Sequence, residues 1–201
     1  MHKNSELIFV KYVKPLIKDS LKVLEIGPDA FPSKYRQLAQ DVSVASWDTL
    51  DTYKNFNLTY ENVDDYNYPI QSGSYDVVLS GSVIEHVPKP WIWIHELARI
   101  TKPGGLVVTI APISWGYHGP IDCWRIYPDG MKSLYEGAGL TILLSCWESL
   151  ETPGYKRYIG GISRELQTRK RQIMLTIFGM LGFPVERAYD SVVIGRKKDN
   201  T

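Results

Sequence analysis

The sequence has little of what would place the protein outside the ordinary soluble globular class. It contains only two cysteines in 201 residues, Cys123 and Cys146, and they stand in no metal-binding or redox spacing. They cannot form a disulfide framework, so we expect a reducing, cytoplasmic setting and no metal. The formal net charge is only +1, which gives no electrostatic reason to expect a nucleic-acid partner.

Long apolar runs are also missing. The longest, from Ile173 to Phe183, is interrupted by glycine and is too short to span a bilayer. Near the N-terminus, Glu6 and Lys11 interrupt the apolar residues, so this segment lacks the core of a signal peptide. A hydrophobic fraction of 44% with 22% charged residues predicts one globular domain over residues 1–201, large enough to bury a sizeable core.

What the sequence does contain is an alternation of strand-like and helix-like segments. A helical stripe covers about residues 5–18. Strands are expected at 22–26, 42–47, 57–61, 75–79, 106–111, 140–146 and 191–196, and further helices at 33–40, 90–101 and 128–138. Residues 149–188 fit no simple alternation, and we treat them as a helical insertion before the last strand. The pattern predicts an α/β fold with a mostly parallel sheet.

The first strand ends in a turn typical of nucleotide-binding units. Glu25 lies in the strand, Gly27 follows it, and Asp48 comes about 20 positions later. A dinucleotide site requires Gly-x-Gly-x-x-Gly, and Asp29 and Pro32 break that pattern. A nicotinamide-dependent oxidoreductase is therefore disfavoured, and an adenosine ligand with a cationic group is favoured. An ordinary strand-to-helix turn remains the alternative.

Carboxylates follow the next two expected strands. Asp48 is placed to accept hydrogen bonds from both ribose hydroxyls of an adenosine, and Asp51 competes for that role. Asp64 and Asp65 follow the third strand, where a carboxylate would accept from the adenine amino group. Exposed loop acids are the alternative for each of them.

Two longer motifs carry a family resemblance. They read SYDVVLSGSVIEHV at residues 74–87 and ELARITKPGG at residues 96–105. Together they resemble the class I S-adenosylmethionine-dependent methyltransferases, in particular their small-molecule branch, over roughly residues 20–148. The resemblance implies a Rossmann-like, seven-stranded, mostly parallel sheet with an antiparallel last strand and helices on both faces.

The same resemblance implies methyl transfer from S-adenosylmethionine to a small-molecule or glycan-type acceptor. Carried onto this chain, it assigns cofactor contacts to Glu25, Gly27, Pro28, Asp48, Asp64, Asp65, Ser80 and Gly81. The chain departs from the family at Asp29 and Phe31, which stand where the second and third glycines are usual. A non-catalytic adenosine-binding or scaffold protein on the same fold is therefore the alternative function.

Two histidines and one polar loop are the candidates for acceptor chemistry. His118 is the first candidate for a general base and His86 the second, with packing as the alternative for His86. Near His118, the sequence places a carboxylate at Asp122, a stacking surface at Trp124 and an anion-binding fork at Arg125. Alternatively, Asp122 and Arg125 pair to brace the loop while Trp124 fills the core.

A basic amphipathic segment runs from about residue 163 to 181. We expect it to cover the substrate pocket or pack against the fold, with subunit pairing or contact with a membrane surface as less favoured alternatives. The sequence does not determine the oligomeric state.

Overall fold

The chain folds around a six-stranded mixed sheet with strand order β2-β1-β3-β4-β8-β5. The computed structural model describes residues 3–52, 57–61, 63–150, 158–159, 162–163, 173–174, 177–178, 180–181 and 189–199. The sheet strands are β1 (Lys22–Ile26), β2 (Ser46–Leu50), β3 (Tyr75–Gly81), β4 (Thr101–Pro112), β5 (Leu140–Glu148) and β8 (Asp190–Lys197). A separate two-stranded pair consists of β6 (Tyr158–Ile159) and β7 (Ile162–Ser163).

Strand directions confirm the expected α/β architecture. Strands β2, β1, β3 and β4 are parallel neighbours, whereas β8 runs antiparallel to both β4 and β5. The predicted antiparallel last strand is therefore confirmed.

The seventh strand is not confirmed. The segment expected to form it, 57–61, contributes one isolated parallel bridge between Leu50 and Tyr60. Two backbone hydrogen bonds form this bridge, from the Tyr60 amide to the Thr49 carbonyl at 2.9 Å and from the Asp51 amide to the Tyr60 carbonyl at 3.2 Å. The next amide along β2, that of Thr49, donates to the side-chain hydroxyl oxygen of Thr59 at 3.1 Å. A side chain thus takes the donor that would extend the ladder.

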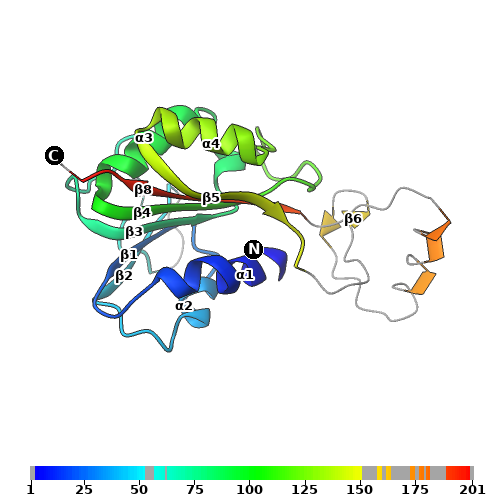
Figure 1. Ribbon diagram of the computed structural model, residues 1–201, viewed down its shortest axis with the longest axis horizontal. Coiled ribbons are helices and arrows are strands. Elements are labelled where there is room, and N and C mark those ends of the chain that lie inside the picture. The colour runs from blue at the N-terminus through cyan, green and yellow to red at the C-terminus, as the bar shows by residue number, and fades with distance from the viewer. Residues whose placement is uncertain are drawn as a thin grey trace.

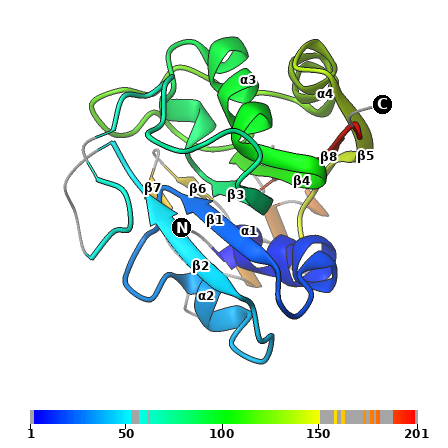
Figure 2. The same ribbon diagram turned by 90° about the vertical axis from the view of Figure 1, so that its left-hand side faces the viewer.

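Helices cover both faces of the sheet. Helix α1 (Lys3–Ile8) continues as a π-helical piece (Phe9–Val13) and a 3₁₀ piece (Lys14–Leu16), so the predicted N-terminal helix exists but changes its pitch. It lies with α2 (Lys34–Leu38) on one face, and α3 (Pro90–Ile100) and α4 (Pro128–Gly137) cover the other (Figures 1 and 2).

The core consists of two clusters, one on each face of the sheet. Neighbouring residues of β3 illustrate the division, since Val77 packs with the α1–α2 side and Val78 with the α3–α4 side. Trp93 of α3, which is 1% exposed, is the largest fully buried side chain. Full burial of each such side chain stabilises the fold by about 1.5–3 kcal/mol. Strands buried on both faces explain the continuous apolar runs in the sequence.

Several strand boundaries differ from the prediction. Strand β4 begins earlier, at Thr101, and β5 ends later, at Glu148. The differences in β2 and β3 move residues relative to the sheet edge. Strand β2 begins at Ser46, because Val42 and Val44 pack against the α1–α2 cluster from a turn outside the ladder. Strand β3 continues through Ser80 and Gly81. The carboxyl ends of both strands therefore come two to three residues later than the sequence pattern indicated.

The predicted insertion is described only in part. The basic residues of the amphipathic segment, Arg164, Arg169, Lys170 and Arg171, lie outside the described residues. Among those described, Ile173, Ile177 and Phe178 are exposed. None of the helices in the described ranges combines the length and apolar character needed to cross a membrane.

Candidate functional site

A cavity of about 370 Å³ lies at the carboxyl ends of β1, β2 and β3. Open α/β sheets bind their ligands at this edge, and the volume falls within the usual range for ligand pockets. The lining residues are Ile26, Gly27, Asp51, Thr52, Asp65, Tyr68, Ser82, Val83, His86, Val87, Trp93, His118, Gly119, Pro120 and Ile121. The cavity therefore joins the first three strand ends to the loop that follows β4.

Gly27 is required by the shape of this cavity. Its φ angle is +68°, and its amide donates to the Leu50 carbonyl at 2.9 Å. A Cβ atom at this position would lie 2.4 Å from Cγ2 of Val83. Any larger residue would therefore strain the backbone and push into the cavity wall.

Glu25 does not reach the cavity. Its side chain is buried under the turn, where Oε2 accepts hydrogen bonds from the Ser33 hydroxyl and, at 2.7 Å, from Nε1 of Trp47. Burial raises the pKa of Glu25 to about 7, against the opposing effect of these two donors. Glu25 thus connects β1 to the start of α2 and to β2, and its role is to shape the turn.

The residues that replace the usual glycines also leave the cavity open. Asp29 accepts a hydrogen bond from the Lys34 amide at 3.0 Å, next to the start of α2. Phe31 is 60% exposed and does not line the cavity. Pro28 is buried beside Gly27 and is likewise absent from the lining.

Of the four aspartates considered for cofactor binding, two line the cavity and two do not. Asp51 and Asp65 line the cavity, and burial together with the charges of Asp64 and Asp51 raises the pKa of Asp65. Asp48 lies inside β2, where it accepts hydrogen bonds from the Tyr75 hydroxyl at 2.7 Å and from Ser46 at 3.2 Å. Asp64 is exposed and accepts from the amide of Tyr66.

The residues expected to border the cofactor after β3 are displaced in the same way. Ser80 is buried within the strand and its hydroxyl pairs with that of Thr109 at 3.0 Å. Gly81 faces Tyr35, whose hydroxyl would lie 2.3 Å from an added Cβ. Ser82 and Val83, which follow the strand, line the cavity in their place.

The cavity brings His86 and His118 together, with ring centres 4.9 Å apart and planes at 78°. Nδ1 of His86 is hydrogen-bonded to the Ile121 carbonyl. Nδ1 of His118 lies 3.2 Å from Oδ2 of Asp122 and 3.2 Å from the Gly116 carbonyl. Each ring therefore has its Nδ1 nitrogen engaged by an oxygen acceptor.

Glu85 lies directly beneath this pair. Its side chain is 1% exposed, and Oε1 lies 3.9 Å from Nε2 of His86. Neither carboxylate oxygen receives a hydrogen bond from another residue in the described part of the chain. Burial raises the pKa of Glu85 to about 8. The sequence motif contains Glu85, but residue type alone gave no sign that its carboxylate would be left without donors.

Asp122, Trp124 and Arg125 form a brace for the loop over the cavity. Arg125 donates from NH1 and NH2 to the two Asp122 oxygens, at 2.5 and 2.7 Å. Its remaining contacts go to the backbone carbonyls of Trp115, Gly116 and Trp124. These contacts occupy all five guanidinium donors, and the Arg125 side chain holds the pKa of Asp122 down at about 2.

Trp124 completes the brace. Its indole nitrogen donates to the Val87 carbonyl at 2.9 Å, and its ring meets Trp91 edge to face. None of the brace residues Asp122, Trp124 and Arg125 lines the cavity. The geometry matches the alternative in which they stabilise the loop, and it leaves them no evident contact with an acceptor.

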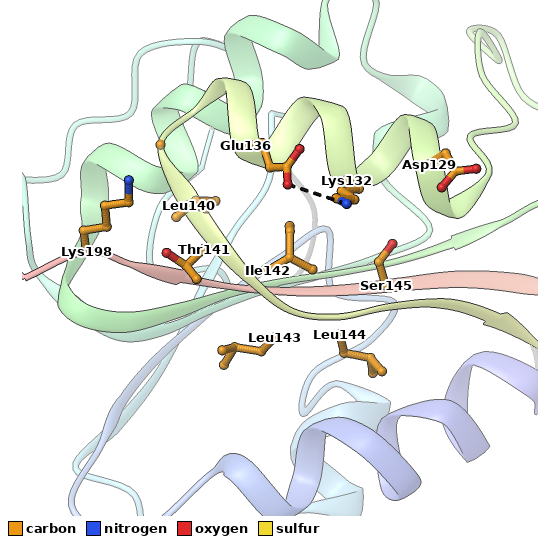
Figure 3. A pocket seen from close by; sticks show the side chains of 11 residues that line it. Asp129, Lys132, Glu136, Leu140, Thr141, Ile142, Leu143, Leu144, Ser145 and Lys198 are labelled. Carbon is orange, nitrogen blue, oxygen red and sulfur yellow. Dashed lines mark ion pairs between the residues drawn. The ribbon is translucent and has the colours of Figure 1, made fainter.

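A second, wider cavity of about 750 Å³ lies along α4 and β5 (Figure 3). Lys132 and Glu136 pair across one side of it at 3.8 Å, while Leu143 and Leu144 point away from α4. The lining contains no residue from the ends of the parallel strands. It also lacks histidines, which the first cavity has.

Comparisons with known proteins connect the chain to methyltransferases. Residues 33–109 match the model of the methyltransferase domain family. An uncharacterized methyltransferase of Mycobacterium sp. (strain JLS) is 47% identical over 49 residues, which are 24% of this chain and 19% of that protein. The match thus spans about a fifth of the length of this curated relative.

Two solved structures share the fold. The candidate methyltransferase of Haloferax volcanii, in complex with the Trm112 methyltransferase activator, superposes with a TM-score of 0.66 at 16% identity, covering 98% of this chain and 90% of that one. Phosphoethanolamine N-methyltransferase 2 of Haemonchus contortus, in complex with S-adenosyl-L-methionine, gives a TM-score of 0.60 at 15% identity, covering 98% and 53%.

Residues 33–109 thus match the methyltransferase domain family, and the chain shares its fold with these two methyltransferases.

Proposed function

We propose that this chain transfers the methyl group of S-adenosylmethionine to a nucleophile on a small-molecule or glycan-type acceptor. The observation that carries the proposal is the single cavity that joins the ends of β1, β2 and β3 to two histidines. When bound, the cofactor supplies an electrophilic methyl group on a positively charged sulfonium. The carboxylates of Asp51 and Asp65 suit a cationic, hydrogen-bond-donating ligand of this kind.

Within the cavity, the cofactor contacts follow from the strand ends. Asp51 comes directly after β2, so we assign the ribose hydroxyls to Asp51 in place of Asp48. Asp65 would accept from the adenine amino group, and Asp64 remains outside. Gly27 has no side chain, so a ligand can approach the β1 turn closely. A Cβ atom at this position would collide with Val83.

The acceptor would lie beneath residues 118–121, which form the opposite wall. Methyl transfer is an in-line displacement, so most of the rate enhancement would come from holding the nucleophile in line with the methyl group. For a hydroxyl acceptor, Nε2 of His118 is the first candidate for the base, because Asp122 and Gly116 engage Nδ1. His86 is the second candidate.

Cofactor binding can be tested with two matched aspartates. Isothermal titration of the wild-type protein with S-adenosylmethionine should show binding. Asp51→Asn should weaken binding by about 10–100-fold, since a charged hydrogen bond contributes about 1.5–3 kcal/mol. Asp48→Asn is the control, because its carboxylate is used by Tyr75 and Ser46 inside the scaffold.

The other outcomes separate the alternatives. If the wild-type protein binds no S-adenosylmethionine, the non-catalytic scaffold is favoured and the proposal fails. Binding of NAD in the same titration would instead favour an oxidoreductase. If Asp48→Asn rather than Asp51→Asn weakens binding, the assignment of the ribose contact returns to Asp48.

A further inference from the structure

Glu85, His86 and His118 bring three potential metal ligands close together, two of them in the cavity lining. One donor atom from each of them lies within 4.8 Å of the other two. Glu85 and His86 come from the short helix after β3 (Ile84–His86), and His118 comes from the loop after β4. Side chains distant in the sequence thus converge where both histidines face the cavity.

The Nδ1 contacts prepare both histidines to act as ligands. A metal-binding histidine typically holds its other ring nitrogen against a carboxylate or a backbone carbonyl, which fixes the tautomer and the ring orientation. His86 has such a contact with Ile121, and His118 has contacts with Asp122 and Gly116. In each ring this arrangement leaves Nε2 as the nitrogen with an available lone pair.

The third ligand is a carboxylate without donors. Glu85 is 1% exposed, and its oxygens receive no hydrogen bond from another described residue. An unpaired carboxylate in such a position is costly, and buried charges are normally paired or coordinate metals. Oε1 of Glu85 lies on the His86 side, 3.9 Å from Nε2.

We infer that Glu85, His86 and His118 bind a divalent transition metal, with Zn²⁺ as the ion that the ligand set fits best. Two imidazoles and one carboxylate suit Zn²⁺ and its first-row neighbours, whereas Mg²⁺ and Ca²⁺ prefer oxygen ligands alone. Three protein ligands leave a coordination position open, as in catalytic zinc sites. This result would replace the sequence-based expectation that the protein binds no metal.

The distances are compatible with one ion. In a tetrahedral site, two ligands at about 2.1 Å from the metal are about 3.4 Å apart. The Glu85–His86 pair, at 3.9 Å, must close by about half an ångström. The widest pair, within 4.8 Å, must close by up to about 1.4 Å, which rotations of the side chains can provide.

The ion's role in catalysis rests on the proposed methyl transfer, but its binding does not. A bound Zn²⁺ would act as a Lewis acid on an acceptor oxygen and take over the task assigned above to His118. Metal binding and cofactor binding can therefore be measured separately on the same protein.

Equilibrium dialysis of the chelator-treated protein against Zn²⁺ tests the inference, with Co²⁺ and its visible d–d absorption as a second readout. We expect about one ion per chain. Glu85→Gln and His118→Asn should each weaken binding at least about 100-fold, because replacing even an outer-shell partner of a ligand costs about 10–100-fold. His95→Ala is the matched control, since His95 is exposed on α3.

A Cys123→Ser/Cys146→Ser double variant checks that the thiols do not hold the metal, and circular dichroism checks that each variant is folded. The inference is overturned if the wild-type protein binds no Zn²⁺ or Co²⁺ while it binds S-adenosylmethionine. It is also overturned if folded Glu85→Gln and His118→Asn bind metal as His95→Ala does. A protein that binds Zn²⁺ at these residues but no S-adenosylmethionine would refute the proposed function and leave the metal site intact.

Discussion

Glu25 and Glu85 occupy similar positions in the fold and differ in what surrounds them. Each lies at the end of a parallel strand or just after it, and each is 1% exposed. Glu25 accepts hydrogen bonds from Ser33 and Trp47. Glu85 receives none from another described residue. Burial raises the pKa of both, to about 7 for Glu25 and to about 8 for Glu85.

The difference indicates which carboxylate serves the scaffold and which is left for chemistry. The donors around Glu25 come from the start of α2 and from β2, and they fix the turn at Gly27. Those donors also oppose the effect of burial on its pKa. Around Glu85 lie the two histidines of the cavity, and the charges of Arg125, Asp190 and Asp122 also act on its carboxylate. Stability measurements on variants of the two residues can therefore test whether the two carboxylates differ in this way.

The largest effect is expected for Glu25→Ala. Its removal leaves the Ser33 hydroxyl and the Trp47 indole nitrogen without their acceptor, and each unsatisfied buried donor costs about 1–3 kcal/mol. We expect the free energy of unfolding, measured by urea denaturation at pH 7, to fall by about 3 kcal/mol. Glu25→Gln, which keeps an acceptor oxygen, should lose much less. Equal losses in both variants would contradict the role given to these hydrogen bonds.

A comparable effect should appear in the pH dependence of stability. The pKa of Glu25 rises from 4.5 to about 7 on folding. Between these values the folded carboxyl holds a proton that the unfolded one has lost, so stability falls as the pH rises through this window and is level above it. The contribution of Glu25 is about 3 kcal/mol.

Urea titrations of the wild-type protein and Glu25→Gln from pH 5 to pH 8 test this contribution. The difference between the two stability curves should change by that amount up to about pH 7 and then stay constant. Parallel curves over the whole range would show that burial does not govern this carboxyl.

The smallest effect is expected for Glu85→Gln in metal-free buffer. No hydrogen bond from another described residue is lost, and an ionisable group leaves the interior. The free energy of unfolding should therefore stay the same or rise. A loss comparable to that of Glu25→Ala would show that Glu85 is part of the scaffold after all.

Much of the fold follows from the sequence because burial on both faces leaves a clear pattern. The run around Val77 and Val78 predicts a central strand, and Pro90 marks the start of α3. The alternation from Val42 to Trp47 was misleading. Half-buried valines in a turn pack against the same cluster as strand residues do, so apolar periodicity did not locate the true start of β2.

The position of the candidate site could be predicted from the sequence, but the residues that line it could be predicted only in part. Ligands at the ends of parallel strands follow from the topology. The sequence assigned Gly27 and Asp65 to cofactor contacts and His86 and His118 to acceptor chemistry, and all four line one cavity. The contact of Asp48 with Tyr75 depends on the register of β2 against β1 and β3, which periodicity does not fix. Arg125 uses every one of its donors within its own loop. This depends on the positions of three backbone carbonyls, which cannot be predicted from the pattern of side chains.

That brace has a thermodynamic consequence for any acceptor. Segments that become ordered on binding subtract the cost of their lost conformational freedom from the affinity. Here the hydrogen bonds of Arg125, Asp122 and Trp124 hold the loop before a ligand arrives. The wall over the histidines is therefore preorganised. A ligand that binds there loses less binding free energy to the ordering of the loop than it would with a flexible loop.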